Sequence, residues 1–251
     1  MPLAHNFGLP WGLWQIVTRL GEAQLMLPTA LALVAWLAWI GERRAALLWL
    51  SLLAFAGGLT TASKVAFIGW GIGIADLNFT GVSGHAMHAA AVFPLLLRCL
   101  SASSGRSTQA AAVVTGYAVG AVVALSRVVI GAHSPSESMA GFALGGAVSA
   151  LGLAFATVPR QHLPRWLLAA LVVAQLLNPT AAPVYSTHDM VTRLALSLSG
   201  HERPFTRAMM HKSSGTGRRL CPALRRPRRC RPEATPDPAM GASTAPAPWC
   251  S

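Results

Sequence analysis

The chain alternates between long uncharged, apolar intervals and short polar connections. A helix needs about 20 apolar residues to cross a bilayer core of about 30 Å. Six uncharged intervals approach or exceed this length: residues 23–41, 45–63, 77–97, 107–126, 138–159 and 166–187. We expect a span in each, the third beginning near Gly84 and the sixth ending near Leu177. The pattern predicts an all-α fold, a polytopic membrane bundle of six transmembrane helices.

The segments that flank these intervals have a different character. Residues 10–22 place Trp11 and Trp14 at helical spacing, which predicts an N-terminal amphipathic helix at the membrane interface. Residues 189–199 have a similar pattern. From about Pro204 the chain is rich in Arg, Pro, Ser and Ala without a hydrophobic period, which is typical of disorder. We therefore expect a membrane domain over residues 1–200, with its core at about 24–178, and a disordered tail over 201–251.

Composition supports a membrane protein, and the net charge belongs to the tail. The chain is 53% hydrophobic and 11% charged, against about 25% charged in soluble domains. Half of the 20 Lys and Arg residues lie in the last 51 residues, so the net charge of +12 does not describe the body. We expect a lipid bilayer as partner and no nucleic acid, although the Arg run at 218–231 leaves binding of nucleic acid or anionic lipid open.

Positive residues predict the orientation, because short loops rich in Lys and Arg stay on the cytoplasmic side. Three connections carry such residues: Arg43 and Arg44, Arg98 and Arg106, and Arg160 and Arg165. The alternate loops, 64–83 and 127–137, then share the outer face. In or next to these two loops lie the residues that could bind a ligand or take part in a reaction: Lys64, Ser83, His85, Arg127, His133 and Glu137.

The first cluster is the sequence Gly81-Val-Ser83-Gly84-His85, immediately before the third span. A Ser-Gly pair at the start of a helix presents free backbone N–H groups and the positive end of the helix dipole, which favours a phosphate. His85 lies one turn further on, within reach of a leaving oxygen. Ser and Gly are also ordinary residues at helix starts, so this cluster alone is a weak signal.

The second cluster runs from Ser126-Arg127 to His133 and Glu137, between spans four and five. Arg127 offers a planar fork for phosphate oxygens, and His133 offers a nucleophile or base. Ser134 to Glu137, with Pro135 at the first helical position, has the pattern of a capping box. That box would begin span five and hold the carboxylate near His133, as the third group of a catalytic triad holds its histidine.

These two clusters resemble the type 2 phosphatidic acid phosphatase superfamily, which also contains glucose-6-phosphatase and vanadium haloperoxidases. Its pattern is Lys, six residues, Arg-Pro; then Pro-Ser-Gly-His; then Ser-Arg, five residues, His, three residues, Asp. The resemblance covers about residues 60–160. Three positions differ from the pattern: Gly71-Ile72 replaces Arg-Pro, Val82 replaces the proline before Ser83, and Glu137 replaces the aspartate.

The resemblance implies a role for each matching residue. It implies that His133 forms a phosphohistidine, that Glu137 orients it, and that His85 protonates the leaving group. It also implies a phosphate-binding set: Lys64, Ser83, Gly84 and Arg127. The resemblance further implies a six-helix membrane core and a reaction that needs no metal or other cofactor. His88 shares a helix face with His85, so a metal site with His133 and Glu137 is an alternative, but the family pattern has no counterpart of His88.

The expected activity is therefore hydrolysis of a lipid phosphate or diphosphate, of the phosphatidic acid or polyprenyl diphosphate type. The enzyme would be a multi-pass protein of the inner, or plasma, membrane, with its active site facing the periplasm or exterior. The absence of Arg-Pro after Lys64 leaves a second function open, in which a non-catalytic relative binds or moves a lipid headgroup. Phosphate release by the purified protein distinguishes the two.

Overall fold

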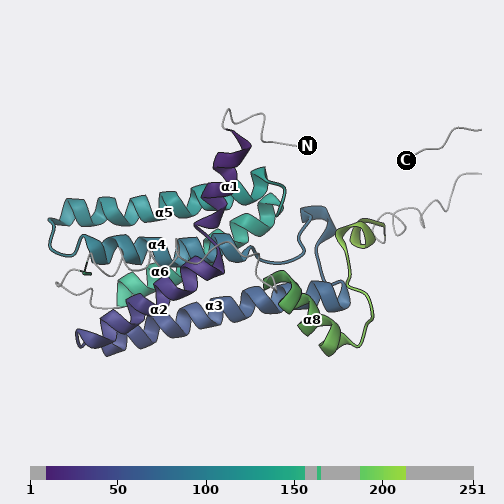
Figure 1. Cartoon of the computed structure of the whole chain (residues 1–251), viewed down its shortest axis with the longest axis horizontal. Coiled ribbons are helices and arrows are strands. Elements are labelled where there is room, and N and C mark those ends of the chain that lie inside the picture. Colours follow the sequence, from purple (N-terminus) through teal and green to yellow (C-terminus); the bar gives the residue numbers. More distant parts are fainter. Residues whose placement is uncertain (1–9, 156–162, 165–186, 213–251) are drawn as a thin grey trace, which may run out of the picture.

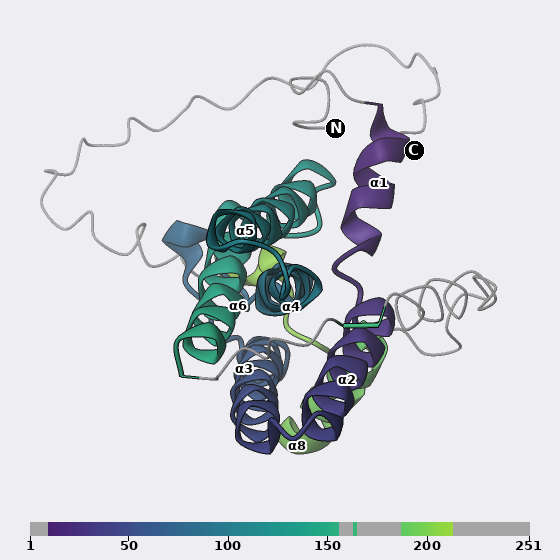
Figure 2. The ribbon, with the colours of Figure 1, turned by 90° about the vertical axis from the view of Figure 1, so that its left-hand side faces the viewer.

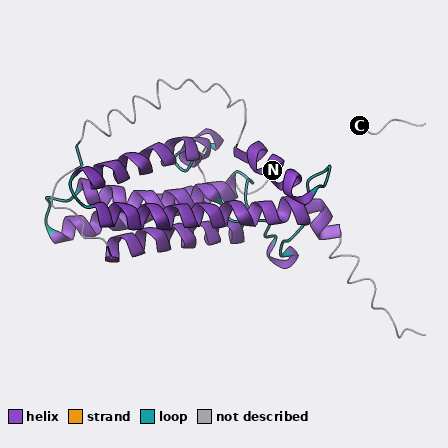
Figure 3. Cartoon of the chain, turned by 90° about the horizontal axis from the view of Figure 1, so that it is seen from below, coloured by secondary structure: helices purple, strands orange, loops and turns teal. Residues whose placement is uncertain are grey.

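A computed structural model of the chain describes residues 10–155, 163–164 and 187–212. Helices make up almost all of these ranges, and no strand occurs within them beyond an isolated bridge between Ile74 and Phe79 (Figure 3). The α-helices are α1 (Trp11–Arg19), α2 (Ala23–Trp39), α3 (Arg43–Trp70), α4 (Gly84–Leu100), α5 (Arg106–Val129), α6 (Pro135–Phe155) and α8 (Thr187–Ser199). A short 3-10 helix, η2 (Ala75–Leu77), interrupts the connection between α3 and α4.

Helix α4 is the centre of the bundle. It contacts α2, α3, α5 and α6, and the view along the helices shows these four around it (Figure 2). Small side chains make this possible, because the run Ala89, Ala90 and Ala91 is completely buried. The core that α4 shares with α2, α3 and α6 is filled by larger apolar side chains, among them Trp49 and Leu33.

Glycines let α6 approach α4 closely. A Cβ atom at Gly141 would lie 2.4 Å from the carbonyl oxygen of Ser83, and one at Gly145 would lie 2.0 Å from that of Met87. Both distances are shorter than any real carbon contact, so only glycine fits. The start of α6, which follows His133, is therefore held against the start of α4, which carries His85.

Five of the six expected spans coincide with helices α2 to α6. Within the described ranges, four helical stretches are long and apolar enough to cross a membrane, namely Trp11–Trp39, α3, α5 and α6, and α4 is a shorter apolar helix of 17 residues. The sixth expected span lies outside the described residues. Helices α1 and α8 match the amphipathic segments expected at 10–22 and 189–199, whereas their place relative to a membrane stays a prediction.

Two boundaries differ from expectation. Lys64, expected in an outer loop, lies within α3, which continues to Trp70 because one lysine in an apolar run does not end a helix. The tail was expected to be disordered from about 201 or 204, but residues 201–212, called here the C-terminal segment, have a defined structure that ends in a helical turn at 207–212. The remainder of the tail, 213–251, lies outside the described residues.

The loops separate into two sets at opposite ends of the bundle (Figure 1). The turns at 40–42 and 101–105 lie at one end. The connections 71–83 and 130–134 lie at the other, as do the end of α8 and the C-terminal segment. The two loops expected on the outer face thus meet, and Ser136 Oγ donates a hydrogen bond of 2.8 Å to the carbonyl oxygen of Leu77.

Candidate active site

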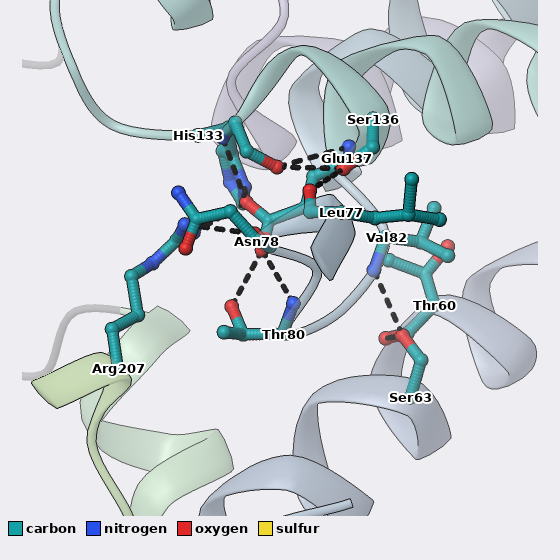
Figure 4. A network of polar contacts seen from close by, with 11 residues as sticks. Thr60, Ser63, Leu77, Asn78, Thr80, Val82, His133, Ser136, Glu137 and Arg207 are labelled. Atoms are coloured by element: carbon teal, nitrogen blue, oxygen red, sulfur yellow. Dashed lines mark hydrogen bonds and ion pairs between the residues drawn. The ribbon is translucent and has the colours of Figure 1, made fainter. Parts of the chain in front are cut away.

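The carboxylate of Glu137 is the centre of the polar network at this end (Figure 4). Pro135 is the first residue of α6, and the capping box has formed: the Glu137 N–H donates to Ser134 Oγ at 3.3 Å, and the Ser134 N–H donates to Glu137 Oε2 at 3.0 Å. The same Oε2 lies 2.8 Å from His133 Nδ1. The side chain of Glu137 therefore both caps the start of α6 and pairs with His133, as expected.

The other oxygen of Glu137 is bound by the α3–α4 connection. Thr80 donates to Oε1 twice, from its N–H at 2.7 Å and from its hydroxyl at 2.6 Å. The side chain of Glu137 has no exposed surface. A buried carboxylate is costly unless it is paired and hydrogen-bonded, so these donors keep a negative charge in place behind His133.

The environment of His133 suits a nucleophile. An ionised carboxylate at Nδ1 favours the tautomer that carries its proton there, which leaves a lone pair on Nε2. Burial lowers the pKa of His133 below its usual value of 6.5, and the hydrogen bond and charge of Glu137 act in the opposite direction. His133 is thus neutral at pH 7, while 14% of its side chain remains accessible.

The start of α4 faces the same network. Ser83 precedes the first residue of α4, Gly84, and its N–H donates to the carbonyl oxygen of Glu137 at 3.1 Å. Its hydroxyl is buried without a hydrogen-bond partner among the described residues. His85 follows in the first turn of α4. An unsatisfied hydroxyl at a helix start is an arrangement that a bound oxyanion would complete.

Two cations approach from neighbouring helices. The Nζ atom of Lys64 lies 3.8 Å from the position that a Cβ at Gly84 would occupy. Arg127, near the end of α5, donates from Nη1 to Thr18 Oγ1 at 2.8 Å, and its buried Nε has no partner in the described part of the chain. Both cations act electrostatically on His85 and on His133. The seven residues expected from the sequence are therefore brought to one end of the bundle.

The metal alternative finds no support in the geometry. His88 lies deeper along α4, within electrostatic range of Lys64. Across the described ranges, no group of three or more His, Cys, Asp or Glu side chains is arranged to hold a metal ion. The polar set of this site is a histidine–carboxylate pair with cations, which is chemistry suited to an anion.

Three contributors were not expected from the sequence. Thr80 binds Glu137 although residues 75–80 carry no motif, and Thr18 binds Arg127 from the amphipathic helix α1. The third is Arg207 of the C-terminal segment, whose Nη2 lies 2.5 Å from Glu137 Oε2. No periodicity or local spacing connects these residues with the site, because each contact joins segments far apart in the chain.

Comparisons with known proteins identify the family of the chain. The family model described as the PAP2 superfamily matches residues 69–161, which span the second and third parts of the motif pattern. The chain is also 37% identical over 206 residues to an uncharacterized 22.5 kDa protein in the cps region of Klebsiella pneumoniae, covering 80% of this chain and 99% of that one. The chain belongs to the PAP2 superfamily. Over the described ranges it is an all-helical bundle with several helices long and apolar enough to cross a membrane.

A solved PAP2 structure has also been matched to the chain. It is the crystal structure of the first transmembrane PAP2 type phosphatidylglycerolphosphate phosphatase from Bacillus subtilis, at 23% sequence identity and a TM-score of 0.49. The match covers 61% of this chain and 80% of that chain. Lys64 lies just before the region of this chain that the PAP2 family model covers, whereas Ser83, His85, Arg127, His133 and Glu137 lie within it.

Proposed function

We propose that the protein hydrolyses a lipid phosphate or diphosphate, without a metal, at the outer face of the membrane and through a phosphohistidine on His133. The observation that carries the proposal is the buried pair of Glu137 and His133 Nδ1, 2.8 Å apart, beside Lys64 and Arg127. A carboxylate on Nδ1 leaves Nε2 free to attack, and two cations suit the charge of a phosphate. Family membership supports the same chemistry.

In the first step, the lone pair of His133 Nε2 forms a bond to phosphorus. The bond from phosphorus to the bridging oxygen breaks, and its electron pair stays on that oxygen. Protonated His85 gives its proton to this oxygen, so the lipid alcohol, or the lipid monophosphate from a diphosphate, leaves neutral at that atom. Glu137 stabilises the positive charge that develops on the ring of His133.

In the second step, water attacks the phosphohistidine. The now neutral His85 takes a proton from the water, whose oxygen forms a bond to phosphorus while the bond to Nε2 breaks. Inorganic phosphate is released and His133 regains its lone pair. Lys64, Arg127 and the backbone at Ser83 and Gly84 hold the non-bridging oxygens through both steps. The two histidines start in opposite protonation states, so a bell-shaped pH profile is expected.

A lipid substrate is favoured by the surroundings of the site. The helices that carry these residues expose large apolar side chains such as Leu47, Phe55 and Val114. Such side chains face lipid when a helix spans a bilayer. A headgroup that enters at the loop end of α3, α4 and α5 would keep its acyl or polyprenyl chains in the bilayer alongside these helices.

Phosphate release by the purified protein in EDTA tests the proposal. The substrates are phosphatidic acid, a phosphatidylglycerol phosphate and a polyprenyl diphosphate, each in mixed micelles. We expect release from at least one of them, lost in His85→Ala and in His133→Ala and retained in His188→Ala, an exposed histidine of α8. Headgroup binding without release would instead support the non-catalytic function, for which the replacement of Arg-Pro by Gly71-Ile72 is the motivating observation.

A further inference from the structure

The C-terminal segment is fastened to the end of α3. Its backbone and side chains bond two carbonyl oxygens there: the Phe205 N–H donates to Ile68 at 2.9 Å, and His201 Nδ1 lies 2.9 Å from the oxygen of Gly69. Met210 is buried in an apolar cluster with residues of α3 and α8. The segment is therefore held on both sides of Arg207.

Phe205 occupies the space beside Gly71. This glycine ends α3 with a φ of +70°, and a Cβ there would lie 2.9 Å from the Cδ1 atom of the Phe205 ring. Any larger residue would displace the ring and carries a conformational cost at positive φ. Position 71 is also where the motif of the resembling family has arginine. Phe205 of the C-terminal segment therefore lies where the side chain of that arginine would begin.

Arg207 extends from this docked segment into the polar network (Figure 4). Its Nη1 donates to the carbonyl oxygen of Asn78 at 3.1 Å, and its Nη2 donates to Glu137 Oε2 at 2.5 Å. His211 lies 3.0 Å from the side-chain oxygen of the same Asn78. Hydrogen bonds at both terminal nitrogens therefore orient the guanidinium of Arg207. Its partner Glu137 is fully buried.

The carboxylate of Glu137 is approached by more hydrogen-bond donors than it has lone-pair sites. Thr80 supplies two at Oε1, while His133, Ser134 and Arg207 share Oε2. A carboxylate offers about four lone-pair sites, so Arg207 and His133 compete for one oxygen. A cation at this point also offsets the negative charge that acts on the imidazole. Arg207 thereby limits how strongly Glu137 holds the proton on His133.

We propose that Arg207 is a positioning residue of the active site, which fixes Glu137 against His133 and sets the basicity of that histidine, and that residues 201–212 belong to the catalytic domain. This inference rests on the proposed function of His133 and Glu137. Arg207 acts on the side of the ring away from Nε2, so it acts through Glu137. Its loss is expected to lower kcat and to leave KM little changed.

The first test compares Arg207→Gln, Arg207→Lys and the control Arg203→Gln, an exposed arginine of the same segment. We expect kcat to fall about 10-fold or more in Arg207→Gln, the scale seen when an orienting partner is lost, with partial recovery in Arg207→Lys. The acid limb of kcat/KM should move to higher pH in Arg207→Gln alone. An unmoved limb, or the same change in Arg203→Gln, would refute the inference.

A second readout does not depend on catalysis. The ring of His133, followed by NMR in detergent micelles, should titrate at higher pH in Arg207→Gln than in the unaltered protein, because the charge of Glu137 is then less offset. The other groups that act on this ring stay in place: Glu137 of α6, Lys64 of α3, Arg127 of α5 and His85 of α4. An unchanged titration would overturn the inference, even if no phosphatase substrate were found and the proposed function itself failed.

A pair of truncations tests the wider claim about the segment. A chain that ends at Lys212 keeps Phe205, Arg207 and Met210, whereas a chain that ends at Gly200 loses all of their contacts. We expect the longer chain to keep kcat within about twofold and the shorter one to lose at least as much as Arg207→Gln. Equal activity of the two chains would show that residues 201–212 lie outside the catalytic domain.

Discussion

The two ends of the helix bundle are connected in different ways. At the end with the turns 40–42 and 101–105, Gln109 bonds near neighbours, because its Nε2 donates to the carbonyl oxygens of Ala102 and Ser104. One longer-range backbone bond, 3.5 Å from the Leu163 N–H to the carbonyl oxygen of Cys99, lies at this end as well. At the other end side-chain hydrogen bonds join distant segments: Thr80 bonds Glu137 across 57 residues, and Arg127 bonds Thr18 across 109. Local bonds can only shape a turn, while long-range bonds fix separate helices relative to one another.

This difference supports the proposed location of the active site. A catalytic site needs side chains from several elements held at defined distances, and among the described residues the end with 71–83, 130–134 and the C-terminal segment has side chains of several elements bonded together in that way. The single carboxylate of Glu137 receives donors from three of these elements. The opposite end can therefore serve as an internal control for every substitution in the site.

The largest contrast between the ends is expected from their glutamates. Glu137→Gln removes the charge behind His133 and should lower kcat about 10³-fold or more, as loss of the carboxylate does in a catalytic triad. Glu42→Gln, at the start of α3 on the opposite end, should leave kcat within about twofold. Initial rates on a lipid phosphate in micelles measure both. Retention of a tenth of the activity in Glu137→Gln would break the comparison.

The next largest effect tests how α4 and α6 hold the site end together. Gly145→Ala places a Cβ atom 2.0 Å from the carbonyl oxygen of Met87, so the two helices must separate, at a cost of about 1–3 kcal/mol. Gly57→Ala, where a Cβ meets nothing within 4 Å, is the matched control and should be neutral or stabilising. Thermal unfolding in detergent gives both values. Equal unfolding midpoints would contradict the close packing of α4 and α6.

The pH dependence sharpens the role of His133. Because burial lowers its pKa, His133 is neutral at pH 7 and becomes protonated only as the pH falls below 6.5. Protonation removes the lone pair of Nε2, so kcat/KM should fall about tenfold per pH unit on the acid side, with a midpoint below 6.5. The limb should be the same for a lipid monophosphate and a diphosphate, whose own phosphates titrate differently. A midpoint above 6.5 for both would count against His133 as the nucleophile.

The smallest expected difference is between two substitutions that each remove a hydrogen-bonding side chain, one at each end of the bundle. Thr80→Val removes the 2.6 Å bond to Glu137, and Gln109→Ala removes two bonds within its turn. Each should lower the free energy of unfolding by about 0.5–1.5 kcal/mol, but only Thr80→Val should also lower kcat. Denaturation and rate measurements on the same samples separate the two effects. A fall in kcat in both variants would mean that the ends do not differ in function.

The sequence predicts the helices and the motif residues because both signals are local. Uncharged intervals mark α2 to α6, and the Ser134–Glu137 capping box predicts both the start of α6 and the pairing with His133. A charge is a poor guide to a helix end, however. The charge of Lys64 predicts a loop, yet α3 continues past it, because a long aliphatic stem lets lysine remain in an apolar helix.

The contribution of the C-terminal segment could not be predicted from the same signals. Arg207 is one of many arginines in a stretch that lacks hydrophobic periodicity, and nothing near it in the sequence distinguishes it. Its contact with Glu137 depends on the end of α3, on Gly71 and on the placement of Phe205. Such a contact follows from the tertiary arrangement of α3, α6 and the C-terminal segment, which no local pattern contains.

Direct detection of the phosphorylated intermediate tests the central role of His133. A radiolabelled aryl phosphate, whose leaving group departs without a proton, is mixed with the His85→Ala variant so that the second step is slowed, and the reaction is quenched with alkali. We predict an alkali-stable, acid-labile phosphate on the peptide that contains His133, and none in the double variant with His133→Ala. Label on another residue, or label that persists without His133, would contradict the account.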